Sequence, residues 1–353
     1  MNKCFGWSCL ILILTLNCSC IEKKPAAAET DKPSLTQLPK LDTFRFSSGT
    51  RSIFQDSNGN YWIGTNGQGV CLFDGTSFAY FSAQEGLSGN QIRSIQEDKY
   101  GNIWFGTGSG VSSYDGKGIA KYTATDYDPN LEWDDSGNYL WFNAGTSPGV
   151  ELFDGRGLRY VPLPIPNNEN TYDSYGVTGI SKDKDGQVWI ATYSALFSFN
   201  GKSITLLDSS QLGLKANEKL HIRSVFADSK GRIWIGNNGI GVLLHDGEST
   251  INFSEINGLI HDNSPKNGDR SPAGTLEHVF SIEEDSQGNI WFGDRDTGAW
   301  KYDGVSMTNY IIDKQLKTQM IWDIHKDQNN NLLFAMADGG IYEFDGKSFY
   351  KKF

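Results

Sequence analysis

The stretch Asp285-Ser-Gln-Gly-Asn-Ile-Trp291 sets the pattern that organises the chain. An Asp side chain can accept hydrogen bonds from its own backbone, and a Gly supplies the positive φ that closes a short turn. The stretch therefore predicts a hairpin whose second strand carries the Trp. The same spacing recurs at Asp56…Gly59…Trp62, Asp98…Gly101…Trp104, Asp183…Gly186…Trp189 and Asp228…Gly231…Trp234. One copy has an extra residue and one lacks both Gly and Trp: Asp134…Gly137…Trp141 and Asp327…Asn330…Leu333.

A second turn signal follows each Trp, or Leu333, by 11 to 13 residues. Its seven occurrences are Asp74-Gly75, Asp115-Gly116, Asp154-Gly155, Asn200-Gly201, Asp246-Gly247, Asp303-Gly304 and Asp345-Gly346. Seven copies fill residues 41–353 at about 45 residues each, a period typical of β-propeller blades. The sequence therefore predicts an all-β fold, a seven-bladed β-propeller of four-stranded antiparallel blades.

The second copy shows the strands that we expect in each blade. Its aromatic and β-branched runs are Gln91–Glu97, Asn102–Thr107, Gly110–Tyr114 and Gly118–Tyr122. The repeated tryptophans are expected to wedge between blades, and each buries apolar surface worth up to about 4–6 kcal/mol. These structural residues are Trp62, Trp104, Trp141, Trp189, Trp234 and Trp291. Two segments, 42–46 and 347–353, could each form the outer strand of the last blade. We favour the C-terminal segment, with 42–46 packed nearby.

The first 40 residues have a different character. Lys3 and the short apolar run Leu10–Leu14 predict an export signal that is too short to span a bilayer. Cys20 then resembles the lipidated cysteine of bacterial lipoproteins; Cys18 is the alternative cysteine, and an ordinary secretory signal is the alternative reading. We expect a signal peptide and anchor site in 1–20, a flexible disordered linker in 21–40, and a lipid anchor in the outer membrane of the cell envelope. The periplasmic or surface side is left open.

Composition argues against several classes of function. The chain has 31 basic and 42 acidic residues, which disfavours a nucleic-acid partner. Four of the five cysteines lie in the leader, and Cys71 sits in an apolar run where core packing is expected. No phosphate-binding glycine loop and no metal-ligand spacing is present. We therefore predict no cofactor, no metal and no catalytic residue. A propeller lyase or hydrolase that uses His221, His261 and His278 remains an alternative.

The repeats resemble a known family. The pattern in Ile95-Gln-Glu-Asp98, Trp104-Phe-Gly-Thr107 and Gly110-Val111 is similar to the two-component-regulator propeller repeat, found in periplasmic sensor domains of bacterial hybrid histidine kinases. The resemblance covers 41–353 and implies an extracytoplasmic binding or scaffold role, often linked to glycan sensing. Those sensors usually carry two propellers, a transmembrane helix and a kinase, so the resemblance does not carry signalling over to this chain.

Alignment of the copies on the turn Asp predicts a binding site. Five residues before it stand Arg51, Arg93, Pro129, Thr178, Arg223, Phe280 and Trp322, and two residues earlier stand Gln91, Tyr127, His221, His278 and Met320. Symmetry places these columns near the mouth of the central channel. Arginine forks suit carboxylates or sulfates, and aromatic rings suit sugar faces.

We therefore expect an anionic or saccharide ligand, with Arg51, Arg93, Arg223, Phe280, Trp322, His221 and His278 as ligand-binding candidates. In the alternative reading the arginines pair with Glu85, Asp126 or Asp128 and are structural. A protein partner on the broad loop face is a further possibility. Two insertions, 162–175 and 253–277, are expected to form part of the rim of that face.

Overall fold

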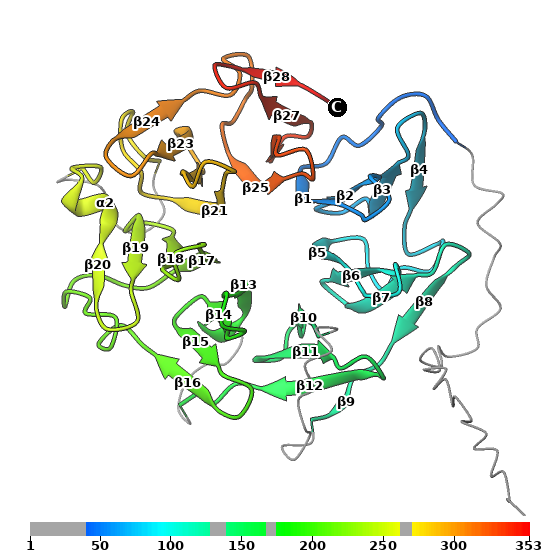
Figure 1. The fold of residues 1–353 in the computed structure, drawn as a ribbon, viewed down its shortest axis with the longest axis horizontal. Helices are drawn as coiled ribbons and strands as arrows, with labels where there is room; N and C mark the ends of the chain where they lie inside the picture. Colours follow the sequence, from blue (N-terminus) through cyan, green and yellow to red (C-terminus); the bar gives the residue numbers. More distant parts are fainter. Residues whose placement is uncertain (1–39, 128–138, 167–173, 262–269) are drawn as a thin grey trace, which may run out of the picture.

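The computed structural model describes residues 40–127, 139–166, 174–261 and 270–353. They form seven four-stranded sheets arranged as the blades of a ring (Figure 1). The predicted seven-bladed, all-β propeller is confirmed. The expected signal peptide, both candidate lipidation cysteines and the linker up to residue 39 lie outside the described residues. Within the described part, no helix combines the length and apolar character needed to cross a membrane.

The strands follow the repeat. Blade 1 contains β1 (Thr50–Gln55), β2 (Tyr61–Thr65), β3 (Val70–Phe73) and β4 (Phe78–Phe81). Blade 2 contains β5 (Ile92–Glu97), β6 (Ile103–Thr107), β7 (Gly110–Tyr114) and β8 (Ile119–Tyr122). Blade 4 contains β13 (Val177–Lys182), β14 (Val188–Thr192), β15 (Leu196–Phe199) and β16 (Ile204–Leu207). The strands of blade 2 agree with the predicted runs to within one residue at each end.

Blades 5 to 7 repeat this order. Blade 5 contains β17 (Ile222–Ala227), β18 (Ile233–Asn237), β19 (Val242–His245) and β20 (Thr250–Asn252), followed by the short helix α2 (Phe253–Ile256). Blade 6 contains β21 (Val279–Glu284), β22 (Ile290–Asp294), β23 (Gly298–Tyr302) and β24 (Met307–Tyr310). Blade 7 contains β25 (Ile321–Lys326), β26 (Leu332–Met336), β27 (Ile341–Phe344) and β28 (Phe349–Lys351).

Blade 3 departs from the expected antiparallel sheet. Its described strands are β10 (Leu140–Asn143), β11 (Gly149–Phe153), β12 (Leu158–Pro162) and β9 (Thr125–Asp126). The short β9 pairs in parallel with the outer edge of β12, through Thr125 opposite Arg159. The turn of this copy, including Asp134 and Gly137, lies in residues 128–138, outside the described part. The described part of blade 3 is thus a four-stranded sheet whose outermost strand, β9, comes from the segment that enters the blade.

In five blades the repeated Asp holds the turn and the Trp together. In blade 2, Oδ1 of Asp98 accepts from the backbone N–H groups of Tyr100 and Asn102, while Oδ2 accepts from the Trp104 indole at 2.8 Å. The same indole bond forms in blades 1, 4, 5 and 6 at 2.8–2.9 Å. A buried indole N–H needs an acceptor, so the Asp both shapes the turn and fixes the orientation of the Trp six residues later.

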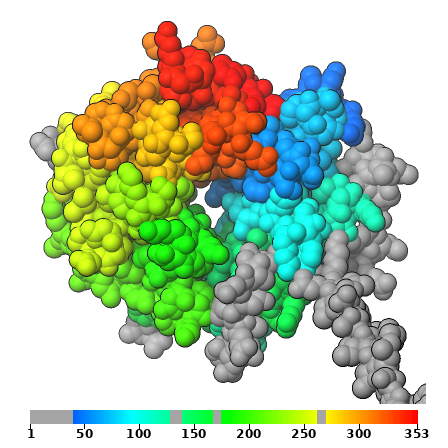
Figure 2. Space-filling model, in the orientation of Figure 1, coloured from blue at the N-terminus to red at the C-terminus, as the bar shows by residue number. Residues whose placement is uncertain are grey.

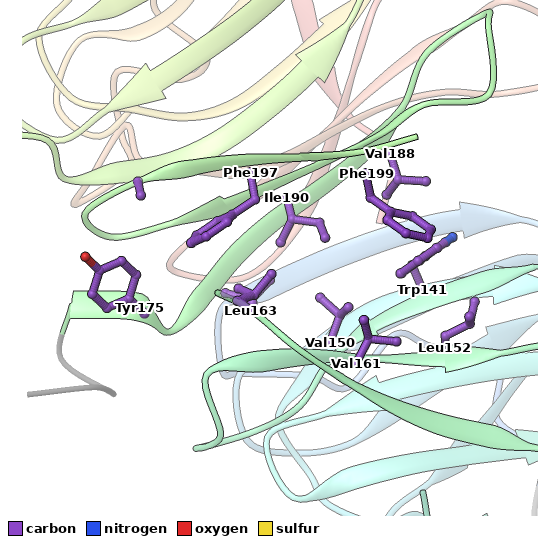
Figure 3. Close-up of a cluster of buried hydrophobic side chains, with 12 residues drawn as sticks. Trp141, Val150, Leu152, Val161, Leu163, Tyr175, Val188, Ile190, Phe197 and Phe199 are labelled. Carbon is purple, nitrogen blue, oxygen red and sulfur yellow. The ribbon is translucent and has the colours of Figure 1, made fainter. Parts of the chain in front are cut away.

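The core lies between neighbouring blades rather than within one sheet. The six repeat tryptophans are between 0 and 7% exposed, as predicted. Figure 3 shows one such layer, in which Trp141 of blade 3 faces Phe199 of blade 4, with Val150 and Ile190 beside them. A single blade would expose these faces to water, so burial of the aromatic residues favours the closed ring. Cys71 is fully buried in the corresponding layer between blades 7 and 1, as expected for a core residue.

The ring closes with the C-terminal segment as the outer strand of blade 7. The sheet order is β25-β26-β27-β28, so the preference for 347–353 over 42–46 is confirmed. The N-terminal segment instead lies against blade 1, where Leu41 forms an isolated antiparallel bridge with Phe78. In Figure 1 this dark blue segment runs along the outside of β4 and approaches the C-terminus. Each blade at the closure thus takes all four of its strands from its own repeat.

Candidate ligand-binding site at the channel mouth

The inner strands share an irregularity that places the predicted column on the channel wall. In β1, β5, β17, β21 and β25 the pairing with the next strand skips one residue. The skipped residues are Arg51, Arg93, Arg223, Phe280 and Trp322. A β-bulge leaves its extra residue unpaired and redirects its side chain. The bulge therefore accounts for the place of this column on the channel wall, which it shares with the residues that follow it in each strand.

A cavity of about 610 Å³ occupies the centre of the ring, and all five skipped residues line it. Figure 2 shows the opening as a hollow between the blades. Thr178, the bulged residue of blade 4, lines it as well, whereas Pro129 of the same column lies outside the described residues. The structure therefore brings together five of the seven ligand-binding residues that the sequence predicted.

Two of the arginines rest on aromatic rings. The Arg51 guanidinium carbon lies 4.6 Å from the centre of the Trp322 ring, and that of Arg223 lies 4.4 Å from Phe280 and 5.4 Å from Tyr193. Phe280 and Trp322 meet edge to face, with centroids 5.5 Å apart. Cations bind favourably over aromatic faces. The rings therefore hold the guanidinium groups, and the guanidinium groups occupy ring faces that the sequence analysis had assigned to sugar stacking.

Neutral amides fix the remaining geometry. Arg51 Nη1 donates to Oδ1 of Asn66, which also accepts from the side chain of Gln91. Arg93 Nε donates to Oε1 of Gln91 and its Nη1 donates to Oδ1 of Asn143, at 3.2 and 3.1 Å. One chain of hydrogen bonds thus joins two guanidinium groups across blades 1, 2 and 3. Each acceptor is an uncharged amide oxygen, so the positive charge is positioned but not neutralised.

In the described part of the chain, the arginines do not pair with the loop acids of the alternative reading. Among the described residues no carboxylate forms an ion pair with Arg51, Arg93 or Arg223. Glu85 instead accepts from the backbone N–H and hydroxyl of Ser82. Asp126 is on the exposed strand β9, and Asp128 lies outside the described residues.

Burial and mutual repulsion act on these cations. Burial, followed by the charges of Arg93 and Arg223, lowers the pKa of the Arg51 guanidinium to about 10. Burial also lowers the pKa of Arg223. Because a lowered arginine pKa means that the cation is destabilised where it sits, a bound anion would relieve a cost already present in the unliganded protein. Among the described residues, these three guanidinium groups have no ion-pair partner, in a chain of net charge −11.

The two predicted histidines lie beside the cavity rather than on its lining. His221 is half-buried, packs edge to face on Tyr193 at 5.2 Å, and has a pKa lowered by burial and then by Arg223. His278 is fully buried, and its backbone N–H donates to Asp294. Their role in ligand binding stays a prediction. Of the predicted pair, His221 is the one that adjoins a channel arginine and its aromatic support.

A second set of polar residues lines the same cavity and was missed by the sequence analysis: Glu283, Asp323 and His325. Burial raises the pKa of both Glu283 and Asp323 to about 7 and lowers that of His325 to about 4. Asp323 Oδ2 accepts from the backbone N–H of Ile53 at 2.8 Å. The aligned copies contained a signal for these residues. Asp323 stands four residues before the turn Asp, where blades 1, 2, 5 and 6 have Ser, and Glu283 and His325 stand two residues before it.

In the loop Asp294-Arg-Asp296, Arg295 forms an ion pair with the adjacent Asp296 at 2.9 Å. Asp294 is fully buried, and burial raises its pKa to about 6. It accepts from the backbone N–H groups of Glu277 and His278, so it anchors the end of the 253–277 insertion to blade 6. Residues 262–269 of that insertion and 167–173 of the other lie outside the described part. Across the described segments, no three His, Cys, Asp or Glu side chains are grouped to hold a metal ion.

Comparisons with known proteins agree with the repeat pattern. Five segments, 46–67, 86–109, 171–194, 219–239 and 274–296, match the family model for the two component regulator propeller. They cover the first two strands of blades 1, 2, 4, 5 and 6. The two blades without a match carry the altered copies, Asp134…Trp141 and Asp327…Leu333. A search of curated proteins found no match to the chain.

Solved structures share the fold. The extracellular domain of a putative hybrid two component system from B. thetaiotaomicron is 21% identical with a TM-score of 0.61, over 87% of this chain and 40% of that one. This chain therefore spans about two fifths of the length of that domain. Virginiamycin B lyase from Staphylococcus aureus is 14% identical with a TM-score of 0.62, over 87% of this chain and 98% of that one. At these identities the likeness concerns the fold. The chain thus carries the two component regulator propeller repeat in five of its seven blades.

Proposed function

We propose that this protein is an extracytoplasmic binding module that holds an anionic ligand at the mouth of its propeller channel. One observation carries the proposal: three partly buried guanidinium groups line one cavity and are held by rings and amide oxygens, and among the described residues no carboxylate forms an ion pair with them. Charge-assisted bonds from Arg to carboxylate, sulfate or phosphate are among the strongest that a side chain makes.

The aromatic residues refine the ligand class. Arg51 and Arg223 occupy faces of Trp322 and Phe280, and these two rings also contact each other edge to face. One face of each ring is then occupied by a guanidinium group and is not free to stack on a neutral sugar. The geometry thus favours recognition of charge over recognition of a sugar face. A saccharide would bind through a carboxylate, sulfate or phosphate that it carries.

The setting of the module is part of the same proposal. The matched family is that of two component regulator propellers, and the similar B. thetaiotaomicron propeller is the extracellular domain of a putative hybrid two component system. Together with the leader sequence this supports a propeller outside the cytoplasm, lipid-anchored through Cys20 (or Cys18) to the outer membrane, with a role in sensing or scaffolding linked to carbohydrates. The role that we propose is non-catalytic. A protein partner on the loop face would use the same positive centre.

Differential thermal unfolding tests the proposal. Glucose 6-sulfate, glucose 6-phosphate and glucuronate should each raise the melting temperature in low-salt buffer, and glucose should not. The Arg51→Met/Arg223→Met double variant should lose the response, while Arg156→Met, which changes an exposed turn residue, should keep it. A response to glucose equal to that of its charged derivatives would reject charge recognition.

A further inference from the structure

We propose that ligand binding at the channel mouth is coupled to docking of the N-terminal segment 40–48, because both fasten the same junction between blades 7 and 1. This inference rests on the proposed function. It adds a consequence of ligand binding, because this segment connects the folded ring to the part of the chain that precedes it. The segment is here called the N-terminal clasp.

The junction between blades 7 and 1 is where the two ends of the ring meet. Every other pair of neighbouring blades is consecutive in the sequence, whereas here β25–β28 meet β1–β4 without a connecting loop. Side chains must therefore supply the fastening. The junction also lacks the repeat indole, because Leu333 takes the place of the Trp of blade 7. This junction is therefore the one in the ring that is held by non-covalent contacts alone.

Blade 1 compensates for the missing indole. Asp327 keeps the turn bonds of the other copies, but its Oδ2 accepts from the hydroxyl of Tyr61 at 2.7 Å. Tyr61 precedes the blade 1 Trp, where the other blades have Ile, Leu or Val. The hydrogen bond that is internal to five blades therefore crosses between blades at this one junction.

The outer end of the junction is filled by aromatic residues from both ends of the chain. Phe353 packs against Tyr61, Phe73 and Phe78, with ring centroids 5.0–6.0 Å apart. Phe44 of the clasp covers Phe78 and Phe353 at 5.9 and 6.3 Å. The clasp thus lies over both sides of the junction.

Hydrogen bonds fix the clasp to blade 1. Leu41 exchanges two backbone bonds with Phe78, and the backbone N–H of Arg45 donates to the Tyr80 hydroxyl at 2.7 Å. The N–H groups of Ser47 and Ser48 both donate to Oε1 of Gln68. Phe44 is the clasp residue that reaches across to the end of the chain, so its contact with Phe353 depends on the junction being closed.

The inner end of the same junction carries the proposed ligand site. Arg51 of blade 1 lies on Trp322 of blade 7, and the next residue of β25, Asp323, accepts from the N–H of Ile53. An anion held by Arg51 and by Arg223 of blade 5 would tie blade 1 to the opposite side of the ring. Ligand and clasp thus stabilise one closed arrangement from its two ends.

Because the anion and the N-terminal clasp both favour the closed junction between blades 7 and 1, binding of one must affect binding of the other. If the closed junction binds both the anion and the clasp more tightly, then each raises the affinity for the other by the same factor. Couplings of this kind commonly change affinity by about fivefold or more. Loss of the clasp contact should therefore weaken anion binding although Phe44 does not line the channel.

Hydrogen exchange on the full chain tests the coupling. Saturating glucose 6-sulfate should slow exchange of the amides of residues 41–48 by about fivefold or more. Phe44→Leu should weaken glucose 6-sulfate binding by a similar factor. The matched control Phe199→Leu removes an aromatic contact with Trp141 at another junction and should leave the affinity unchanged.

The possible failures are distinguishable. If the wild-type chain binds glucose 6-sulfate but exchange of 41–48 and the affinity of Phe44→Leu are both unchanged, the coupling is wrong and the anion site stands. If both Leu variants weaken binding equally, general loss of stability is the cause and the coupling is again rejected. If the wild-type chain binds no anion, the proposed function fails and the coupling fails with it.

Discussion

The hydroxyl of Tyr61 in blade 1 donates to the carboxylate of Asp327 in blade 7 at 2.7 Å. In five other blades the equivalent Asp accepts from an indole of its own blade. Despite burial, which acts in the opposite direction, the hydrogen bonds from Tyr61 and Asn331 leave the pKa of Asp327 lowered. At the closure of the ring, the turn Asp therefore accepts a hydrogen bond as it does in the other blades, but the donor comes from the neighbouring blade.

Removing that donor should weaken the closed ring. Tyr61→Phe deletes the hydroxyl and leaves Asn331 as the remaining donor to Oδ2 of the buried Asp327, at a cost of about 1–3 kcal/mol in the free energy of unfolding. Chemical denaturation measures the change. Tyr302→Phe is the matched control, because the Tyr302 hydroxyl donates to an exposed backbone carbonyl. Equal destabilisation by both variants would show that the Tyr61–Asp327 bond has no special weight.

The altered turn of blade 7 offers a backbone test. Asn330, with φ of 66°, is the one residue other than glycine with positive φ in the described segments of the chain. Asn tolerates this conformation better than Ala, which should cost about 1–2 kcal/mol there. Asn330→Ala should therefore lower the free energy of unfolding, and Asn330→Gly should leave it unchanged or raise it slightly. Unfolding in urea would contradict this account if the two variants were equally stable.

Much of the fold could be predicted because the same local chemistry is repeated. Asp98, Gly101 and Trp104 are close in sequence, and their contacts need no knowledge of the rest of the chain. The parallel pairing of Thr125 with Arg159 could not be predicted, because it depends on where the segment entering blade 3 passes a completed hairpin. The Tyr61–Asp327 bond joins residues 266 positions apart, and no local pattern signals it.

The site was predictable to the extent that symmetry determines it. The column five residues before the turn Asp gave Arg51, Arg93 and Arg223, and the observed bulges explain why that column reaches the channel. What binds each arginine depends on distances between blades. The sequence pattern therefore could not predict that the arginines donate to amides such as Asn66 and not to carboxylates such as Glu85.

Glu283 should make stability depend on pH in a defined direction. Burial raises its folded pKa from 4.5 to about 7. A raised carboxyl pKa contributes stability that is fully present below the unfolded pKa and is lost as pH rises through the folded pKa. Between about pH 4 and pH 8, Glu283→Gln should therefore gain about 2–3 kcal/mol in unfolding free energy relative to wild type.

The comparison for this titration is Glu248→Gln, which changes an exposed turn residue. Its stability relative to wild type should stay constant over the same pH range. Denaturant melts at pH 4, 6 and 8 give the required differences. A Glu283→Gln curve that runs parallel to wild type would mean that the carboxyl titrates as it does in water.

The arginine cluster should cost stability in the absence of ligand. Arg51→Met keeps an unbranched side chain over Trp322 and removes one of three mutually repelling charges, so unliganded protein should gain about 1 kcal/mol or lose nothing. The gain should shrink in high salt, which screens the repulsion. Thermal unfolding in 20 mM and 500 mM NaCl (about 20 Å and 4 Å Debye lengths) measures both effects. Marked destabilisation of the variant at low salt would show that Arg51 is a structural cation.

Calorimetric titration of the wild-type chain with glucose 6-sulfate at low ionic strength tests the central claim most directly. The account predicts saturable one-to-one binding that weakens with added salt and is lost in Arg51→Met/Arg223→Met, while glucose gives no heat of binding. Binding that persists unchanged in the double variant, or no binding of any sulfated, phosphorylated or carboxylated sugar to the wild-type chain, would contradict it.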